Sequence, residues 1–150
     1  MTDILIDYNG QLLAGDVRQV GPDLETDDGL KTAVVISLFT DRRAASDDAL
    51  PAGDQDRRGW WGDSLASDDG DQIGSLLWLL LREKQTAAVL RRAETYAQDA
   101  LQWLVDDRIA LSVTVIAEWV SRGLLGLAIT IERPNAEPVE FEFNHLWENV

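Results

Sequence analysis

The chain of 150 residues contains no cysteine, one histidine and few basic side chains. Without cysteine it can form no disulfide, no thiolate metal site and no cysteine nucleophile. The single histidine, His145, excludes an HExxH motif and any zinc site that needs a pair of histidines. No apolar run approaches the ~18 residues that cross a bilayer, and the first residues lack the basic and apolar regions of a signal peptide. We therefore expect a soluble protein that is made in the cytoplasm.

Acidic residues dominate the charge: 27 Asp and Glu stand against 13 Lys and Arg, which gives a net charge of −14. Such a chain repels phosphate backbones and anionic lipid head groups, and no basic stripe offsets the repulsion. We therefore expect neither nucleic acid nor a membrane as a partner. The length and the 45% hydrophobic content suit one folded domain over residues 1–150.

Motifs with a chemical function are scarce. No phosphate-binding GxxxxGK[ST] loop, no GxGxxG after a strand and no GxSxG elbow is present. Residues 54–59 resemble the opening of a calcium loop, but Arg58 and Leu65 stand where ligands are needed. A carboxylate pair for glycoside hydrolysis could use Glu118, although its strand phase favours an exposed residue. We expect His145 to pack rather than to act as a base, and we predict no catalytic, metal or cofactor site.

The N-terminus predicts a β-hairpin. Ile4, Ile6 and Tyr8 alternate with polar or outward-facing residues, as in a half-buried strand. Asn9-Gly10 follows, a pair that favours a tight two-residue turn, and residues 11–13 would form the returning strand.

Three helices are expected. Apolar residues at helical spacing predict the first over residues 30–40, with Thr26 as its cap. The second begins after Ser75 and contains residues 76–81, which are all apolar and so need cover on several sides. The third shows the cleanest 3.6-residue period. Its apolar face consists of Val89, Leu90, Ala93, Ala97, Ala100, Leu101 and Leu104.

The last third of the chain alternates apolar and polar residues over 109–119, 125–131 and 139–143, with turns at 121–123 and 134–138. This pattern predicts a three-stranded antiparallel meander with one apolar face, which the third helix can cover. The fold class is therefore α+β: about three helices on a C-terminal sheet, with an N-terminal hairpin and a long acidic loop.

That irregular loop covers about residues 41–73, and nine acids and four arginines lie between positions 41 and 71. Long loops without secondary structure are unusual in compact domains and are often functional or ordered by a partner. Trp60 and Trp61 lie in its middle, flanked by arginines and glycines. Either the two rings fill the core beneath the loop, or they anchor a partner, since Trp and Arg are enriched at interface hot spots. The sequence leaves both interpretations open, and we expect the arginines to meet Asp56 and Asp63.

Several of these segments also resemble a known family. The string DRRGWWGD at 56–63 and the segment GSLLWLLLREK at 74–84 are similar to the signature of the Mu-like phage gene-product-46 family of contractile-tail proteins. Residues 30–41 and the closing pattern of strands resemble it as well. The resemblance implies a layout related to T4-type gene-25-product baseplate wedge proteins. Such proteins lie in several copies around the tail tube, and their C-terminal sheet takes strands from the first ring of the sheath.

The resemblance thus implies a structural protein and not an enzyme, located in the virion tail and, during assembly, in the host cytoplasm. Its partners would be other baseplate proteins and the sheath subunit. Exposed strand edges fit this role, because they can pair with an added strand. Two alternatives remain, a tail-associated peptidoglycan hydrolase with paired carboxylates and a small adaptor that binds a partner helix. The residues expected to contact partners are Arg57, Arg58, Trp60, Trp61, Asp63, Leu77, Trp78, Leu81, Ile129, Ile131, Glu140 and Glu142.

Overall fold

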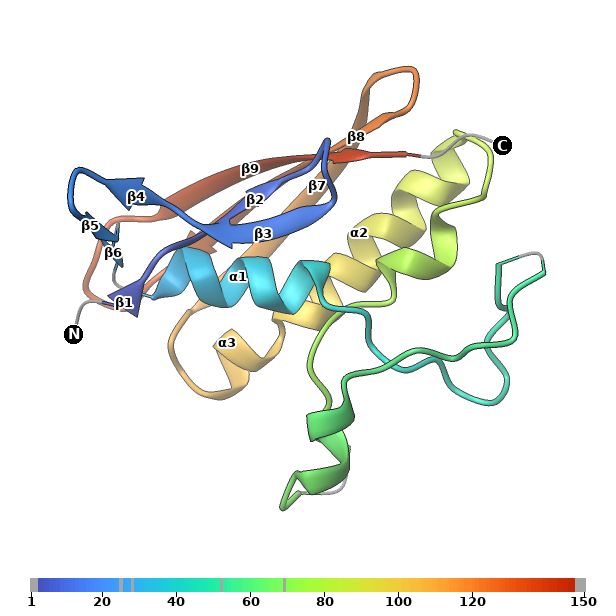
Figure 1. Cartoon of the computed structure of the whole chain (residues 1–150), viewed down its shortest axis with the longest axis horizontal. Coiled ribbons are helices and arrows are strands. Elements are labelled where there is room, and N and C mark those ends of the chain that lie inside the picture. The colour runs from blue at the N-terminus through green and yellow to red at the C-terminus, as the bar shows by residue number, and fades with distance from the viewer. Residues whose placement is uncertain (1–2, 25, 28, 52, 69, 148–150) are drawn as a thin grey trace.

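The computed structural model describes residues 3–24, 26–27, 29–51, 53–68 and 70–147. Its largest element is an antiparallel sheet of three strands in the order β7 (Ser112–Ser121), β8 (Leu124–Glu132) and β9 (Val139–Leu146) (Figure 1). The predicted C-terminal meander is therefore confirmed. The turn between β7 and β8 uses Gly123 at a φ of 79°, which favours glycine.

Two α-helices of ten or more residues cover the apolar face of this sheet in the described part of the chain, α1 (Leu30–Phe39) and α2 (Ala87–Leu101). Helix α2 packs along β7, and α1 packs on α2. Thr86 begins α2 by accepting a hydrogen bond from the backbone N–H of Val89. The predicted apolar face of α2 is confirmed, because five of its residues are buried. After a break at Gln102 the chain forms the short helix α3 (Trp103–Asp106).

The expected middle helix is wrong. Its apolar residues form only one 3-10 turn, η2 (Leu77–Leu80), although all four are buried as the pattern required. Two side chains hold this stretch to the segment after α1. The hydroxyl of Ser75 donates to the carbonyl of Leu38 at 2.6 Å, and the indole N–H of Trp78 donates to the carbonyl of Arg42 at 2.8 Å. Both bonds hold the start of the stretch, and at its end the backbone N–H of Glu83 donates to the carbonyl of Leu80, where the chain turns. Neither long helix in the described ranges has the length and apolarity that crossing a bilayer requires.

The N-terminal hairpin is confirmed, but its turn is longer than predicted. Strand β2 (Ile6–Asn9) pairs with β3 (Ala14–Val17), so four residues connect them and the return begins later than expected. The side-chain oxygen of Asn9 accepts from the backbone N–H groups of Gln11 and Leu12, which stabilises this wider turn.

Short strands that the sequence did not reveal follow the hairpin. Strand β4 (Gln19–Val20) pairs with β5 (Asp23–Leu24), and β1 (Asp3–Ile4) pairs with β6 (Thr26–Asp27). Thr26 therefore belongs to a strand and does not cap α1. The cap residue is Gly29, which has a φ of 84°.

The acidic loop leaves the end of α1 and projects away from the sheet (Figure 1). Its two ends lie together, because Asp41 and Ser75 form an isolated parallel bridge. Within the described residues of the loop, the one helical segment is the short 3-10 helix η1 (Trp61–Leu65). A small second cluster of buried residues, Ala44, Trp78 and Leu79, lies where the loop meets η2.

Candidate interaction surfaces

The middle strand β8 cannot serve as an interface. Ile129 and Ile131 are 0% exposed and face the helices, and β8 is paired on both sides. Both residues were expected to contact a partner, but they belong to the core. Leu77 and Trp78 are buried as well, and Leu81 is half-buried against the cluster around Trp78. The surfaces left for recognition are therefore the edges of the sheet and the acidic loop.

The edge at β7 is closed by side chains of α2. The carboxylate of Glu94 accepts a hydrogen bond from the backbone N–H of Ala117 at 3.0 Å, and the side-chain amide of Gln98 donates to the carbonyl of Val113. Backbone groups along a strand alternate between its two sides, so these bonds lie on the side away from β8. The sequence interpretation missed this role of Glu94 and Gln98. The sequence did contain a signal for it, because residues four apart on the polar face of α2 lie side by side and can reach the same neighbouring strand.

The edge at β9 is covered at its C-terminal end by the hairpin turn, where Gly10 lies against the carbonyl of Asn144, and it is open at Glu140 and Glu142. The N–H of Leu146 points away from β8 and donates to the carbonyl of Gly10 at 2.8 Å, while the next N–H, of Trp147, donates to Gly123. By the same alternation, the N–H groups of Glu140, Glu142 and Asn144 face outward. No strand in the described ranges pairs with them.

A polar cleft of about 360 Å³ separates the edge of β9 at Glu142 from the hairpin residues Asp7 to Gln11. Both Glu140 and Glu142 are exposed. The open edge therefore carries two carboxylates and is accessible from solvent.

His145 lies near the C-terminal end of β9 and packs against the N-terminal hairpin, in agreement with the expected packing role. Its Nδ1 lies 2.7 Å from the hydroxyl of Tyr8, whose ring stacks on Phe39 with 3.6 Å between centroids. Burial lowers the pKa of His145 to about 4, so the ring is neutral at neutral pH. Burial, with the nearby charge of Asp41, raises the pKa of Tyr8 to about 12. The pair fastens the N-terminal hairpin to β9.

The two arginines that precede the tryptophans bind other groups of the same chain. The guanidinium of Arg58 lies 4.4 Å from the ring centre of Trp78 and forms ion pairs with Asp41 at 2.9 Å and Asp54 at 3.7 Å. Arg57 donates to the carbonyls of Ala45 and Ser46. The expected pairing of these arginines with Asp56 and Asp63 is replaced by these contacts, so the arginines stabilise the loop.

The two tryptophans lie on the surface. Trp60 is 46% exposed and Trp61 is 73% exposed, so the interpretation that they fill the core is wrong. The ring of Trp60 rests on Gly62, where an added Cβ would collide with it. This contact holds the ring in place without burying it. Large exposed aromatic rings on a fixed backbone are typical of protein-binding surfaces.

The candidate for acid catalysis has no suitable environment. Glu118 is exposed on the outer face of β7, whereas a general acid needs an apolar pocket that raises its pKa. In the part of the chain that the structure describes, no group of three His, Asp or Glu side chains is arranged to hold a metal ion.

An open strand edge and a loop that presents aromatic rings are features of a small α+β protein that assembles with other proteins. Comparison with known proteins identifies the family. The family described as Phage protein GP46 matches residues 30–138, and the chain belongs to this family.

Two relatives match almost end to end. One is named baseplate protein gp46 of Escherichia phage Mu. It is 46% identical to this chain over 151 residues, and the match covers the full length of both chains. The other is named Mu-like prophage FluMu protein gp46 of Haemophilus influenzae, which is 40% identical over 148 residues, with 98% of each chain covered. The family that the loop and η2 segments resemble in sequence is thus confirmed.

Proposed function

We propose that this protein is a structural component of the baseplate of a contractile phage tail, present in several copies around the tail tube. It would form part of the wedge and help to nucleate the sheath by accepting a sheath strand at the edge of β9. The name of the Mu relative supports the baseplate role. The single observation that carries the finer role is the β9 edge, which is open at Glu140 and Glu142, whereas side chains of α2 bind outward groups of β7.

The chemistry of the edge supports strand addition. The outward N–H and C=O groups of Glu140 and Glu142 would supply main-chain hydrogen bonds to an added strand. The carboxylates of Glu140 and Glu142 would favour lysine or arginine at the facing positions of that strand. They would also repel the same edge of a second copy, which protects the free protein from pairing with itself.

The alternatives have less support. The hydrolase candidate Glu118 is exposed and has no apolar pocket to raise its pKa, as a general acid requires. An adaptor that binds a helix on residues 76–81 lacks an open apolar face, because η2 is buried. We therefore propose a structural role without catalysis.

A proline at position 142 tests the proposed strand addition. Glu142→Pro removes one outward N–H and leaves the hydrogen bonds between β8 and β9 in place, whereas Glu142→Ala removes the carboxylate and keeps the N–H. Purified sheath subunit from the same phage should be captured by the wild type and by Glu142→Ala, and only weakly by Glu142→Pro. Equal capture by both variants, with unchanged folding by circular dichroism, would exclude β9 as the sheath contact.

A further inference from the structure

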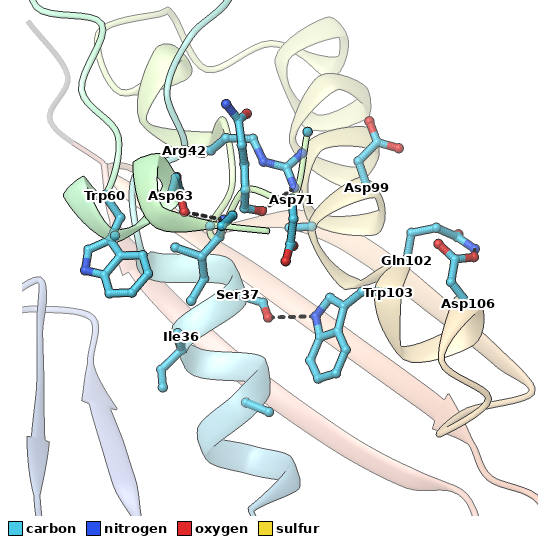
Figure 2. A pocket seen from close by; sticks show the side chains of 18 of the residues that line it. Ile36, Ser37, Arg42, Trp60, Asp63, Asp71, Asp99, Gln102, Trp103 and Asp106 are labelled. Carbon is cyan, nitrogen blue, oxygen red and sulfur yellow. Dashed lines mark hydrogen bonds between the residues drawn. The ribbon is translucent and has the colours of Figure 1, made fainter. Parts of the chain in front are cut away.

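A groove of about 670 Å³ lies between α1, the end of α2 with α3, and the tip of the acidic loop. It is separate from both edges of the sheet. Its volume falls within the range of known binding sites. Figure 2 shows the rings of Trp60 and Trp103 on the two sides of the α1 segment that carries Ile36 and Ser37. Elements from three distant parts of the chain thus form one surface.

The apolar walls of the groove are held in fixed positions. The indole N–H of Trp103 donates to the hydroxyl of Ser37 at 3.0 Å, which orients the ring while 36% of the residue stays exposed. On the other side the ring of Trp60 rests on Gly62. Ile36 is half-buried and lies on the Trp60 side of α1 (Figure 2). Rings that are already ordered lose little conformational entropy on binding, so they are suited to anchor an apolar side chain.

The polar lining of the groove is acidic. Four aspartates line it, Asp63, Asp71, Asp99 and Asp106, against one basic residue, Arg42. The last two aspartates lie on the Trp103 side (Figure 2). A rim of this charge attracts lysine and arginine, and the net charge of −14 adds long-range steering of a basic partner. A second copy of this acidic chain would instead be repelled.

Two buried atoms of the lining lack a hydrogen-bond partner within the described ranges, Asp63 Oδ2 and Arg42 Nε. The other carboxylate oxygen of Asp63 accepts from the N–H of Ile73 at 3.2 Å, and the terminal nitrogen of Arg42 donates to the carbonyl of Gln72 at 3.1 Å. Buried polar atoms normally find partners. Because solvent does not reach these two atoms, the groups that a bound peptide can reach are the exposed carboxylates of Asp99 and Asp106.

We propose that this groove binds a segment of a partner protein in which an apolar or aromatic side chain is flanked by lysine or arginine. The apolar or aromatic side chain lies against Trp60 and Ile36, and the flanking basic side chains reach Asp99 and Asp106 on the Trp103 side. The site would give the protein a second contact in an assembly, on a different surface from β9. The inference does not rest on strand addition, because no residue of β9 lines the groove.

Two synthetic peptides of equal length and charge test the proposal. One has leucine and tryptophan between lysines, and the other has serines in their place. Calorimetric titration into the full chain should show binding of the first peptide at least about tenfold tighter than binding of the second, since burying an aromatic anchor is worth about 1.4 kcal/mol or more. The indole N–H resonance of Trp103 should shift only with the first peptide.

Neighbouring residues supply matched control variants. Trp60 and Asp106 line the groove, whereas Trp61 and Asp107 do not. Trp60→Ala should weaken binding of the apolar peptide at least about tenfold and Trp61→Ala less than about twofold, in line with the concentration of binding energy in a few residues. Asp106→Asn should weaken binding more than Asp107→Asn, and more at low salt than at high salt.

Equal binding of the two peptides would overturn the proposal, because it would show unspecific attraction to an acidic protein. Equal effects of Trp60→Ala and Trp61→Ala would overturn it as well. The variant Glu142→Pro should bind the apolar peptide as the wild type does. Loss of sheath capture and loss of peptide binding are therefore separate results.

Discussion

The two edge strands of the C-terminal sheet, β7 and β9, are similar, but their outward backbone groups differ in the contacts they make with the rest of the chain. At β7, Glu94 and Gln98 of α2 satisfy outward backbone groups. At β9, the outward groups of Glu140 and Glu142 face solvent, and only the end of the strand contacts the N-terminal hairpin. An unprotected edge is a liability for a free protein. The difference indicates that the β9 edge is kept open for use.

The largest expected effect comes from the strand that supports both edges. Ile129→Asp places an unpaired charge in the core and should cost more than about 4 kcal/mol, which abolishes cooperative unfolding in urea. Ala128→Asp, one residue earlier on the exposed face, should cost about 1 kcal/mol or less. Similar losses for the two variants would contradict the assignment of Ile129 to the core.

The contact between Tyr8 and His145, which holds the hairpin against β9, depends on pH because His145 can take up a proton. Its pKa is about 4 in the folded chain, against an ordinary value of 6.5, so the unfolded chain binds more protons between these values. Stability from this residue is fully present above pH 6.5, falls progressively as the pH drops from 6.5, and is lost below about pH 4. Between pH 7 and pH 5, the wild type should lose about 2 kcal/mol more than His145→Gln in urea unfolding. Parallel losses in both proteins would contradict the buried neutral histidine.

Opening the closed edge has a smaller effect. Glu94→Ala leaves the N–H of Ala117 without its acceptor and should destabilise the protein by about 1–2 kcal/mol. Light scattering should also show weak aggregation, because a second edge becomes available. The control Glu118→Ala alters an exposed carboxylate and should change stability by less than about 0.5 kcal/mol. If Glu94→Ala behaves like its control, α2 does not protect the β7 edge.

Neutralising the open edge should change stability least. The double variant Glu140→Gln and Glu142→Gln should stay within about 0.5 kcal/mol of the wild type. It should form dimers at high concentration in analytical ultracentrifugation, since the carboxylates no longer repel a second edge. The double variant Glu118→Gln and Glu137→Gln makes the same charge change elsewhere and should remain monomeric.

Regular periods make much of this fold predictable. Strict alternation locates the three strands, and the 3.6-residue spacing correctly predicts the apolar face of α2. The helix over residues 76–81 could not be rejected from sequence, because the bond from Trp78 to Arg42 joins residues 36 positions apart. The hairpin turn differs from its prediction because the side chain of Asn9 stabilises a wider turn.

The interaction surfaces are less predictable for the same reason. The polar neighbours of Trp60 and the apolar neighbours of Trp78 agree with the exposure of the first ring and the burial of the second, but they do not show which surface the exposed ring joins. Closure of β7 depends on a contact between Glu94 and Ala117, 23 positions apart. The groove residue Trp103 has no local signal either, because its neighbours across the groove come from α1 and the loop.

Residue-resolved hydrogen exchange tests the central claim most directly. The full chain, labelled with ¹⁵N, is compared alone and with the sheath subunit bound. The N–H groups of Glu140 and Glu142 should exchange slowly only in the complex, while that of Ala117 should be protected equally in both states. Protection that appears along β7, or a complex in which the β9 groups still exchange freely, would contradict strand addition at β9.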